Sequence, residues 1–226
     1  MLKLNLGCGF HTPSGWLNVD YAIGAWLAKT PGFSTINKKF KFINFNWSND
    51  IFLCDLTKKL PWDDDSVDII YSSHSLEHLS KIEGRYLLRE CHRLLKPNGI
   101  IRIVVPDLKV IINRYTEGKI AADEVLDQLY VSYNSPTDGV LKQIIAPFIQ
   151  FPHKCMYDTP TLLRIMSEIG FEVISKQAFE SEIKDVEVIE QSERTAESII
   201  VEGKKISAYV CKQANFVPLD SLANET

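Results

Sequence analysis

The sequence predicts an α/β fold built on a doubly wound sheet. Short apolar runs alternate along the chain with stretches of helical periodicity, and a Gly-x-Gly turn joins the first two runs. The runs at 67–71 and 100–105 are apolar except for one charged residue each, as is typical of strands at the centre of a parallel sheet. We expect strands near 2–6, 16–20, 51–54, 67–72, 99–105, 171–177 and 206–212.

Two helices are predicted from apolar residues at helical spacing. The first covers about 82–96 and ends where Lys-Pro-Asn-Gly at 96–99 turns the chain toward the next strand. The second opens at Thr159 with Pro160 in its first turn, and Gly170 ends it. Each helix is followed directly by a predicted strand, as an α/β fold requires.

Two stretches are longer than the connections of a bare sheet. Residues 21–50 are rich in aromatic side chains, and 107–158 carry a helical pattern followed by proline, aromatic and methionine residues. Long insertions often form lids or binding loops, so we expect 107–158 to be a helical cap beside the substrate. The lysine- and aromatic-rich run at 38–47 favours an edge hairpin or a lid over nucleobase stacking. We expect one domain over 1–212 and a frayed tail over 213–226.

Composition excludes several classes of protein. The 226 residues carry a net charge of −4 and a pI near 5.8, which argues against general nucleic-acid binding. The five cysteines are widely spaced and form no Cys-x-x-Cys pair, so neither a zinc site nor a disulfide framework is expected. No signal peptide is predicted, and no apolar run reaches the roughly 20 residues that cross a membrane. We therefore expect a cytoplasmic protein without a membrane span or a metal.

The Gly-x-Gly turn is the strongest functional signal. Leu-Gly-Cys-Gly at 6–9 exposes backbone to which a ligand can approach closely, and Asp20 ends the second strand, where an acid can bind ribose hydroxyls. The dinucleotide fingerprint has a third glycine and an acid about 20 residues further on, whereas here Asp20 comes early. Too few residues remain for a full helix between the strands. A nucleoside without phosphates therefore fits better than NAD.

The remaining motifs complete a recognisable order. After Leu-Gly-Cys-Gly and Asn-Val-Asp at 18–20 come Cys-Asp-Leu at 54–56, Leu-Pro-Trp-Asp at 60–63, Ser-Ser-His-Ser-Leu-Glu-His-Leu at 72–79 and Arg-Leu-Leu-Lys-Pro-Asn-Gly at 93–99. This order resembles the class I S-adenosylmethionine (SAM)-dependent methyltransferases, in particular the type 11 branch of small bacterial enzymes often associated with surface-glycan gene sets. The resemblance covers 1–106 strongly and 150–212 more loosely. It implies a Rossmann-like, seven-stranded parallel sheet with a reversed last strand, helices on both faces, and SAM as the cofactor.

The resemblance also implies roles for three residues of the first two motifs. Gly7 and Gly9 would let the backbone approach the methionine and ribose part of SAM, and Asp20 would accept both ribose hydroxyls. The alternatives are structural, because glycines also serve plain turns and an aspartate can cap or turn the chain.

Four further residues would contact the cofactor by the same resemblance. Asp55 would accept the adenine amino hydrogen with Leu56 stacking nearby, and Ser72 or Ser73 would meet the methionine end. Asp55 has a structural alternative as a helix cap. The acidic run at 63–65 favours a solvated turn, since calcium loops alternate their ligands with spacers.

Three histidines are candidates for catalysis. His74 and His78 follow the fourth strand directly, where a methyl acceptor would approach the sulfonium, and histidine can accept a proton near neutral pH. His153 lies before the last predicted helix, where the resemblance places the acceptor pocket. Glu77 is expected to tie loops together. The structural alternative is a capped helix start for His74 and His78, and an ordinary loop histidine for His153.

We therefore expect SAM-dependent methyl transfer to a small-molecule or glycan-like acceptor, at oxygen. The alternative is a regulatory or scaffolding protein that binds SAM or a related nucleoside without catalysis. A sugar hydroxyl has a high pKa, so an oxygen acceptor needs a base, and His74 or His153 would supply it. The identity of the acceptor and the oligomeric state stay open, because acceptor choice resides in the cap.

Overall fold

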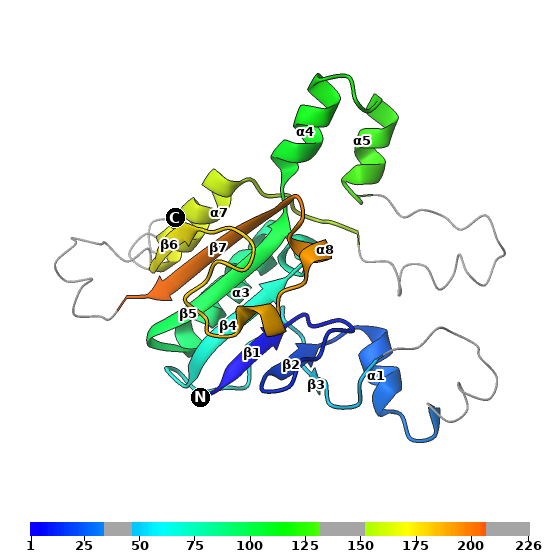
Figure 1. The fold of residues 1–226 in the computed structure, drawn as a ribbon. Helices are drawn as coiled ribbons and strands as arrows, with labels where there is room; N and C mark the ends of the chain where they lie inside the picture. The colour runs from blue at the N-terminus through cyan, green and yellow to red at the C-terminus, as the bar shows by residue number, and fades with distance from the viewer. Residues whose placement is uncertain (34–46, 132–151, 207–226) are drawn as a thin grey trace, which may run out of the picture.

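The computed structural model describes residues 1–33, 47–131 and 152–206. Within them the chain forms one seven-stranded sheet in the order β3-β2-β1-β4-β5-β7-β6 (Figure 1). The strands are β1 Lys3–Leu6, β2 Leu17–Asp20, β3 Phe52–Leu53, β4 Val67–Ser73, β5 Leu95–Pro106, β6 Phe171–Ser175 and β7 Ser198–Lys205. The first five run parallel and β7 is antiparallel to both of its neighbours, so the predicted sheet with one reversed strand is confirmed.

The position of the reversed strand differs from the prediction. It spans Ser198–Lys205, whereas Ile206 is already outside it and the rest of the predicted 206–212 strand lies outside the described residues. The charged Glu202 and the glycine at 203 both have low strand propensity. Gly203 in fact sits where the sheet meets a helix, since a Cβ there would lie 2.9 Å from the Met166 side chain. Close packing of the helix on the sheet thus requires a glycine at position 203, although glycine is unfavourable in a strand.

Both predicted helices are present. Helix α3 (Lys81–Leu94) begins with a capping box between Ser80 and Glu83. Its predicted end at 96 is two residues late, because Leu95 already pairs with Val67 of β4. Helix α7 (Thr159–Ile169) is capped by Asp158 and ends at Gly170, whose φ of 113° suits glycine.

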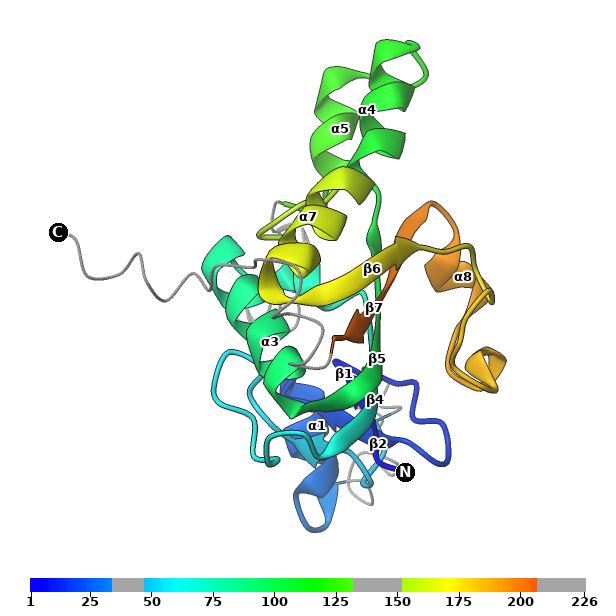
Figure 2. The ribbon, with the colours of Figure 1, turned by 90° about the vertical axis from the view of Figure 1, so that its left-hand side faces the viewer.

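The two faces of the sheet are covered differently (Figure 2). Helices α3 and α7 pack on one face over a large apolar core that includes Leu87, Leu94 and Met166. The segment 176–197 covers the other face with the short helices η2 (Val186–Val188) and α8 (Ser192–Thr195). Its buried residues Ile183, Val186 and Ile189 form a second apolar cluster with Trp16, Tyr71, Val104 and Ile200.

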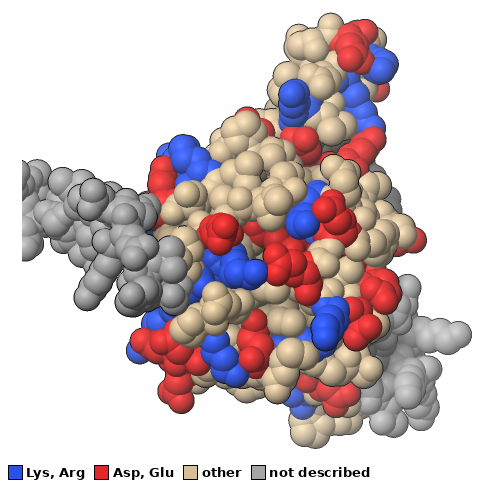
Figure 3. Space-filling view, turned by 60° about the vertical axis from the view of Figure 1, so that its left-hand side comes forward, with Lys and Arg blue, Asp and Glu red and all other residues tan. Residues whose placement is uncertain are grey.

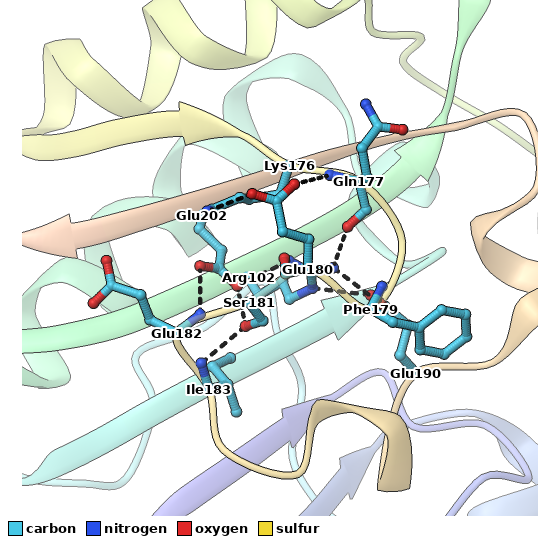
Figure 4. A network of polar contacts seen from close by, with 10 residues as sticks. All are labelled: Arg102, Lys176, Gln177, Phe179, Glu180, Ser181, Glu182, Ile183, Glu190 and Glu202. Atoms are coloured by element: carbon cyan, nitrogen blue, oxygen red, sulfur yellow. Dashed lines mark hydrogen bonds and ion pairs between the residues drawn. The ribbon is translucent and has the colours of Figure 1, made fainter.

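A buried ionic network fixes this covering segment to the sheet (Figure 4). Arg102 of β5 is fully buried and donates to Glu190 at 2.9 Å and to Glu202 at 2.8 Å. Its guanidinium also donates to the backbone carbonyls of Gln177 and Glu180. Because the side-chain hydrogen bonds of Arg102 to described residues all end on this segment or on β7, the network helps to set where the chain before α8 lies.

The connections carry the remaining helices. Helix α1 (Ile23–Lys29) follows β2, and η1 (Leu76–His78) follows β4. Helices α4 (Leu108–Thr116) and α5 (Ala122–Gln128) pair and project beyond the end of β5 (Figure 1), in the described part of the predicted cap. No helix separates β1 from β2, as their short spacing predicts. The predicted hairpin or lid at 38–47, except Trp47, and the tail at 213–226 lie outside the described residues.

The described residues carry charges of both signs on the surface, and their cysteines are free thiols. On the face shown in Figure 3, acidic and basic side chains are interspersed over the described residues. None of the helices in the described ranges combines the length and the apolar character that a membrane crossing requires. Cys8, Cys54, Cys91 and Cys155 are free thiols. Burial raises the pKa of Cys8 to about 12, so this thiol stays protonated beside the glycine turn.

Candidate functional site

Strand register brings the predicted cofactor residues to one edge of the sheet. Leu6 of β1 pairs with Val19 on one side and with Ser72 on the other. The next residues, Gly7, Asp20 and Ser73, therefore lie side by side at the carboxyl ends of the three strands. Gly7 has a φ of 69° and Gly9 one of 56°, which only glycine adopts readily. Ligands of open α/β sheets bind at this edge.

Asp20 organises the turn around it. Its Oδ2 accepts a hydrogen bond from the Gly9 N–H at 2.8 Å, while Oδ1 accepts from the N–H groups of Tyr21 and Ala22 at 2.7 and 2.8 Å. The aspartate therefore has the structural role that the sequence left as an alternative. A carboxylate offers about four acceptor positions, so capacity for a ribose hydroxyl remains on Oδ2.

The other predicted cofactor residues follow β3 or end β4. The Asp55 Oδ1 accepts from the Thr57 N–H at 2.9 Å and the Thr57 hydroxyl at 2.7 Å, so Asp55 turns the chain after β3. Leu56 packs against the main core. Ser72 and Ser73 end β4 and are buried. The register of β2 with β3 pairs Asp20 with Leu53, which keeps Asp55 on the same edge as the glycine turn.

Arg194 is a site residue that sequence reasoning missed. Helix α8 carries it across the carboxyl edge, where its Nη1 donates to the Ser73 carbonyl at 3.2 Å. Its Nη2 lies 3.7 Å from where a Cβ on Gly9 would stand. No ion pair joins Arg194 to a carboxylate within the described ranges. A small cavity between Arg194, Gly7 and Ser73 thus presents an unpaired cation next to the glycine turn.

A second cavity lies beyond Arg194, between the ends of β5 and β7 and the α4–α5 pair. Its volume is about 480 Å³. All three candidate histidines, His74, His78 and His153, line it. Arg114, Tyr130 and Ser198 line it as well. The fold therefore brings together histidines that lie up to 79 residues apart in the sequence.

His74 lines the larger cavity and contacts Arg194, which lines the smaller one. The His74 backbone has a φ of 51°, and its Nε2 lies 2.8 Å from the Arg194 carbonyl oxygen. Its Nδ1 lies 3.3 Å from the carboxylate of Glu77. Both ring nitrogens are therefore engaged with protein groups, so in this arrangement His74 positions Glu77 and Arg194 rather than facing an acceptor with a free lone pair.

His78 and His153 form a pair on the cavity wall. Their ring centroids are 5.1 Å apart, and the His78 Nδ1 lies 3.4 Å from the Pro152 carbonyl oxygen. Burial lowers the pKa of His153, and its Nδ1 has no hydrogen-bond partner among the described residues. Glu77 lies directly behind them and is 1% exposed.

The sheet order with its reversed strand, together with a glycine turn beside an acid at the end of β2, defines the class I methyltransferase fold. Residues 4–103, from β1 into β5, match the family model described as a methyltransferase domain. Over these residues, which are fewer than half of the 226, the chain is similar to methyltransferases, a similarity that supports SAM as the cofactor. No curated protein sequence matches this chain.

Solved structures with a similar fold come from several bacteria. The YcgJ protein of Bacillus subtilis is 16% identical, with 91% of this chain and 92% of that chain covered and a TM-score of 0.49. A SAM-dependent methyltransferase of Thermotoga maritima, titled a possible histamine N-methyltransferase, is 16% identical, with coverage of 90% and 81% and a TM-score of 0.43. The 1,6-didemethyltoxoflavin-N1-methyltransferase of Burkholderia thailandensis, solved with bound 1,6-didemethyltoxoflavin and S-adenosylhomocysteine, is 13% identical, with coverage of 91% and 71% and a TM-score of 0.47.

Proposed function

We propose that the chain transfers the methyl group of SAM to a hydroxyl of a small-molecule or glycan-like acceptor held in the 480 Å³ cavity. The observation that supports this most is that His74 lines the histidine-rich cavity and contacts the backbone of Arg194, whose side chain lies at the cofactor edge. Pockets for small ligands usually measure about 300–1,000 Å³. We therefore place the donor at the glycine turn and the acceptor in the cavity that His74 lines.

On the donor side, each residue has a distinct part. SAM, when bound, supplies an electrophilic methyl group on a sulfonium. The bare backbone at Gly7 and Gly9 would leave room for the ligand, and Asp20 would accept the ribose hydroxyls. Ser73 and Arg194 would hold the methionine end, with the Arg194 guanidinium available to the carboxylate, while Asp55 and Leu56 would contact adenine. A fixed donor in line with the acceptor oxygen supplies much of the rate, up to roughly 7–11 kcal/mol in well-oriented systems.

On the acceptor side, the cavity wall suits a polyol. Arg114 pairs with Glu197 and lies 3.4 Å from the Gln128 side chain, so a charged pair and an amide face the cavity together. Tyr130 adds an aromatic surface. Hydrogen-bonding groups around an aromatic ring match the alternating hydroxyls and C–H faces of a sugar. His78 and His153 then activate the hydroxyl that receives the methyl group.

Arg194→Gln should weaken S-adenosylhomocysteine binding about 10-fold or more, because a hydrogen bond to a charged group contributes about 1.5–3 kcal/mol. Affinity for 5′-methylthioadenosine, which lacks the carboxylate, should be unchanged. Asp20→Asn should weaken the binding of both ligands, since both carry the ribose. Calorimetry with Arg164→Gln, an exposed arginine, as the control tests this. Equal losses for both ligands in Arg194→Gln would show that Arg194 does not hold the carboxylate.

The double variant His78→Gln/His153→Gln should lower turnover by about 10²–10⁴-fold, the usual contribution of side chains that handle the acceptor proton. Its affinity for S-adenosylhomocysteine should equal that of the wild type, because neither histidine touches the glycine turn. S-adenosylhomocysteine release is measured over a panel of sugar nucleotides and glycans. Cofactor binding with no turnover on any hydroxyl acceptor would favour the alternative of a non-catalytic SAM-binding protein.

A further inference from the structure

Glu77, His78 and His153 lie in the arrangement of a metal site. One oxygen or ring nitrogen from each of the three lies within 4.8 Å of those of the other two. We propose that this group binds one divalent transition-metal ion, Zn²⁺ or Mn²⁺, at the wall of the acceptor cavity. Two imidazoles and one carboxylate are a ligand set that such ions use in catalytic sites, with further positions left open for substrate. The sequence predicts no metal, because these ligands lack a spacing signature.

The environment of Glu77 favours binding of a cation. Its side chain is 1% exposed, and neither carboxylate oxygen has a hydrogen-bond partner among the described residues. The nearest ionisable partner is the His74 Nδ1 at 3.3 Å, on one oxygen alone. Burying a carboxylate without hydrogen bonds carries a large desolvation penalty. An ion bound between Glu77 and the two rings removes that penalty.

The ring nitrogens of the two histidines are placed differently. The His78 Nδ1 lies 3.4 Å from the Pro152 oxygen. The His153 Nδ1 is buried and has no hydrogen-bond partner among the described residues, so it is available as a ligand atom. A metal-binding histidine usually donates its other ring N–H to a carbonyl or carboxylate, as the His78 Nδ1 is placed to do toward the Pro152 oxygen.

Backbone hydrogen bonds hold the three ligands together before any ion arrives. The N–H groups of Lys154 and Cys155 both donate to the Glu77 carbonyl, at 2.8 and 3.1 Å. The His153 N–H donates to the Tyr130 carbonyl at 2.9 Å. The segment after the cap is thereby fixed against η1. Metal–ligand bonds of about 2.0–2.2 Å need ligand atoms closer than 4.8 Å, so side-chain rotations would complete the site and the ion should stabilise the fold.

The catalytic part of this inference rests on the proposed function, whereas the binding of the ion does not. Coordination lowers the pKa of an acceptor hydroxyl, so that its proton passes to water in the cavity. The acceptor oxygen then forms a bond to the methyl carbon, the carbon–sulfur bond breaks, and its electron pair stays on sulfur. His78 and His153 act as ligands in this scheme, and the ion, rather than a free imidazole, activates the acceptor.

The test titrates Zn²⁺ alone into the full chain after chelator treatment, by calorimetry, with Co²⁺ absorption as a second readout. One ion per chain is expected, with a rise in Tm. His78→Gln and His153→Gln should each weaken binding about 100-fold or more, since even indirect partners of metal ligands contribute 10–100-fold. His92→Gln changes a half-buried histidine of α3 outside the cavity and should bind like the wild type.

Absence of uptake, or uptake that survives both His78→Gln and His153→Gln, would overturn the metal site. Circular dichroism of each variant excludes unfolding as the cause of lost uptake. Turnover that is equal with and without chelator, in a chain that does bind the ion, would overturn the activating role alone. Ion binding in a chain that transfers no methyl group would contradict the proposed function and leave the metal site standing.

Discussion

Arg102→Met should lower the free energy of unfolding by about 3–5 kcal/mol, the usual effect of removing one partner from a buried ion pair. Arg102 is fully buried, and its loss leaves Glu190 and Glu202 as unpaired carboxylates that are almost wholly buried. Urea denaturation followed by circular dichroism measures the change. Since the same network positions the segment before Arg194, affinity for S-adenosylhomocysteine should fall as well.

The control for this prediction is Arg164→Met. Arg164 also pairs with a glutamate, Glu168, but on the surface, where its side chain is 55% exposed and such pairs contribute about 0–1 kcal/mol. A variant that also converts Glu190 and Glu202 to glutamine should recover part of the loss, because no buried negative charge is then left unpaired. Similar losses for Arg102→Met and Arg164→Met would show that the buried network contributes little.

Gly7→Ala should lower the free energy of unfolding by about 2–5 kcal/mol and abolish measurable SAM binding. The left-handed backbone costs a residue with a Cβ about 1–2 kcal/mol, and overpacking adds roughly 1–3 kcal/mol. The new Cβ would stand 1.9 Å from the Ser75 hydroxyl oxygen and 2.6 Å from the Ser75 Cβ. Ser75 would have to leave the carbonyls of Gly7 and Ser73, which it contacts at the cofactor edge.

Gly15→Ala is the matched control for crowding. Gly15 also has a positive φ, of 81°, but nothing lies within 4 Å of the point where a Cβ would stand. Gly15→Ala should therefore lower the free energy of unfolding only by the cost of the left-handed backbone, and it should still bind the cofactor. Thermal unfolding and calorimetry with S-adenosylhomocysteine compare the two variants. If both lost the same stability and both still bound the ligand, the close contact of Gly7 with Ser75 would have no functional consequence.

Local signals predicted the elements that local physics decides. Pro160 in the first turn and Gly170 at the end mark the bounds of α7 in the sequence, because such signals act within one helical turn. The reversed strand was misplaced because Glu202 and Gly203 oppose strand propensity on their own. Glu202 is tolerated there only because Arg102 of the neighbouring strand neutralises it, a contact 100 residues distant in sequence.

In the candidate site, too, some features follow from local sequence patterns and others only from the tertiary structure. The sequence by itself determined the class I fold and the glycine turn beside Asp20, since a Gly-x-Gly between two strands and an acid at a strand end are short-range patterns. Only the tertiary structure decided that Arg194 crosses this edge and that His153 meets Glu77 and His78 around one cavity. These contacts depend on how the chain after β5 packs back over the sheet. No periodicity or spacing encodes that packing, because it follows from burial of apolar surface and pairing of charge over the whole domain.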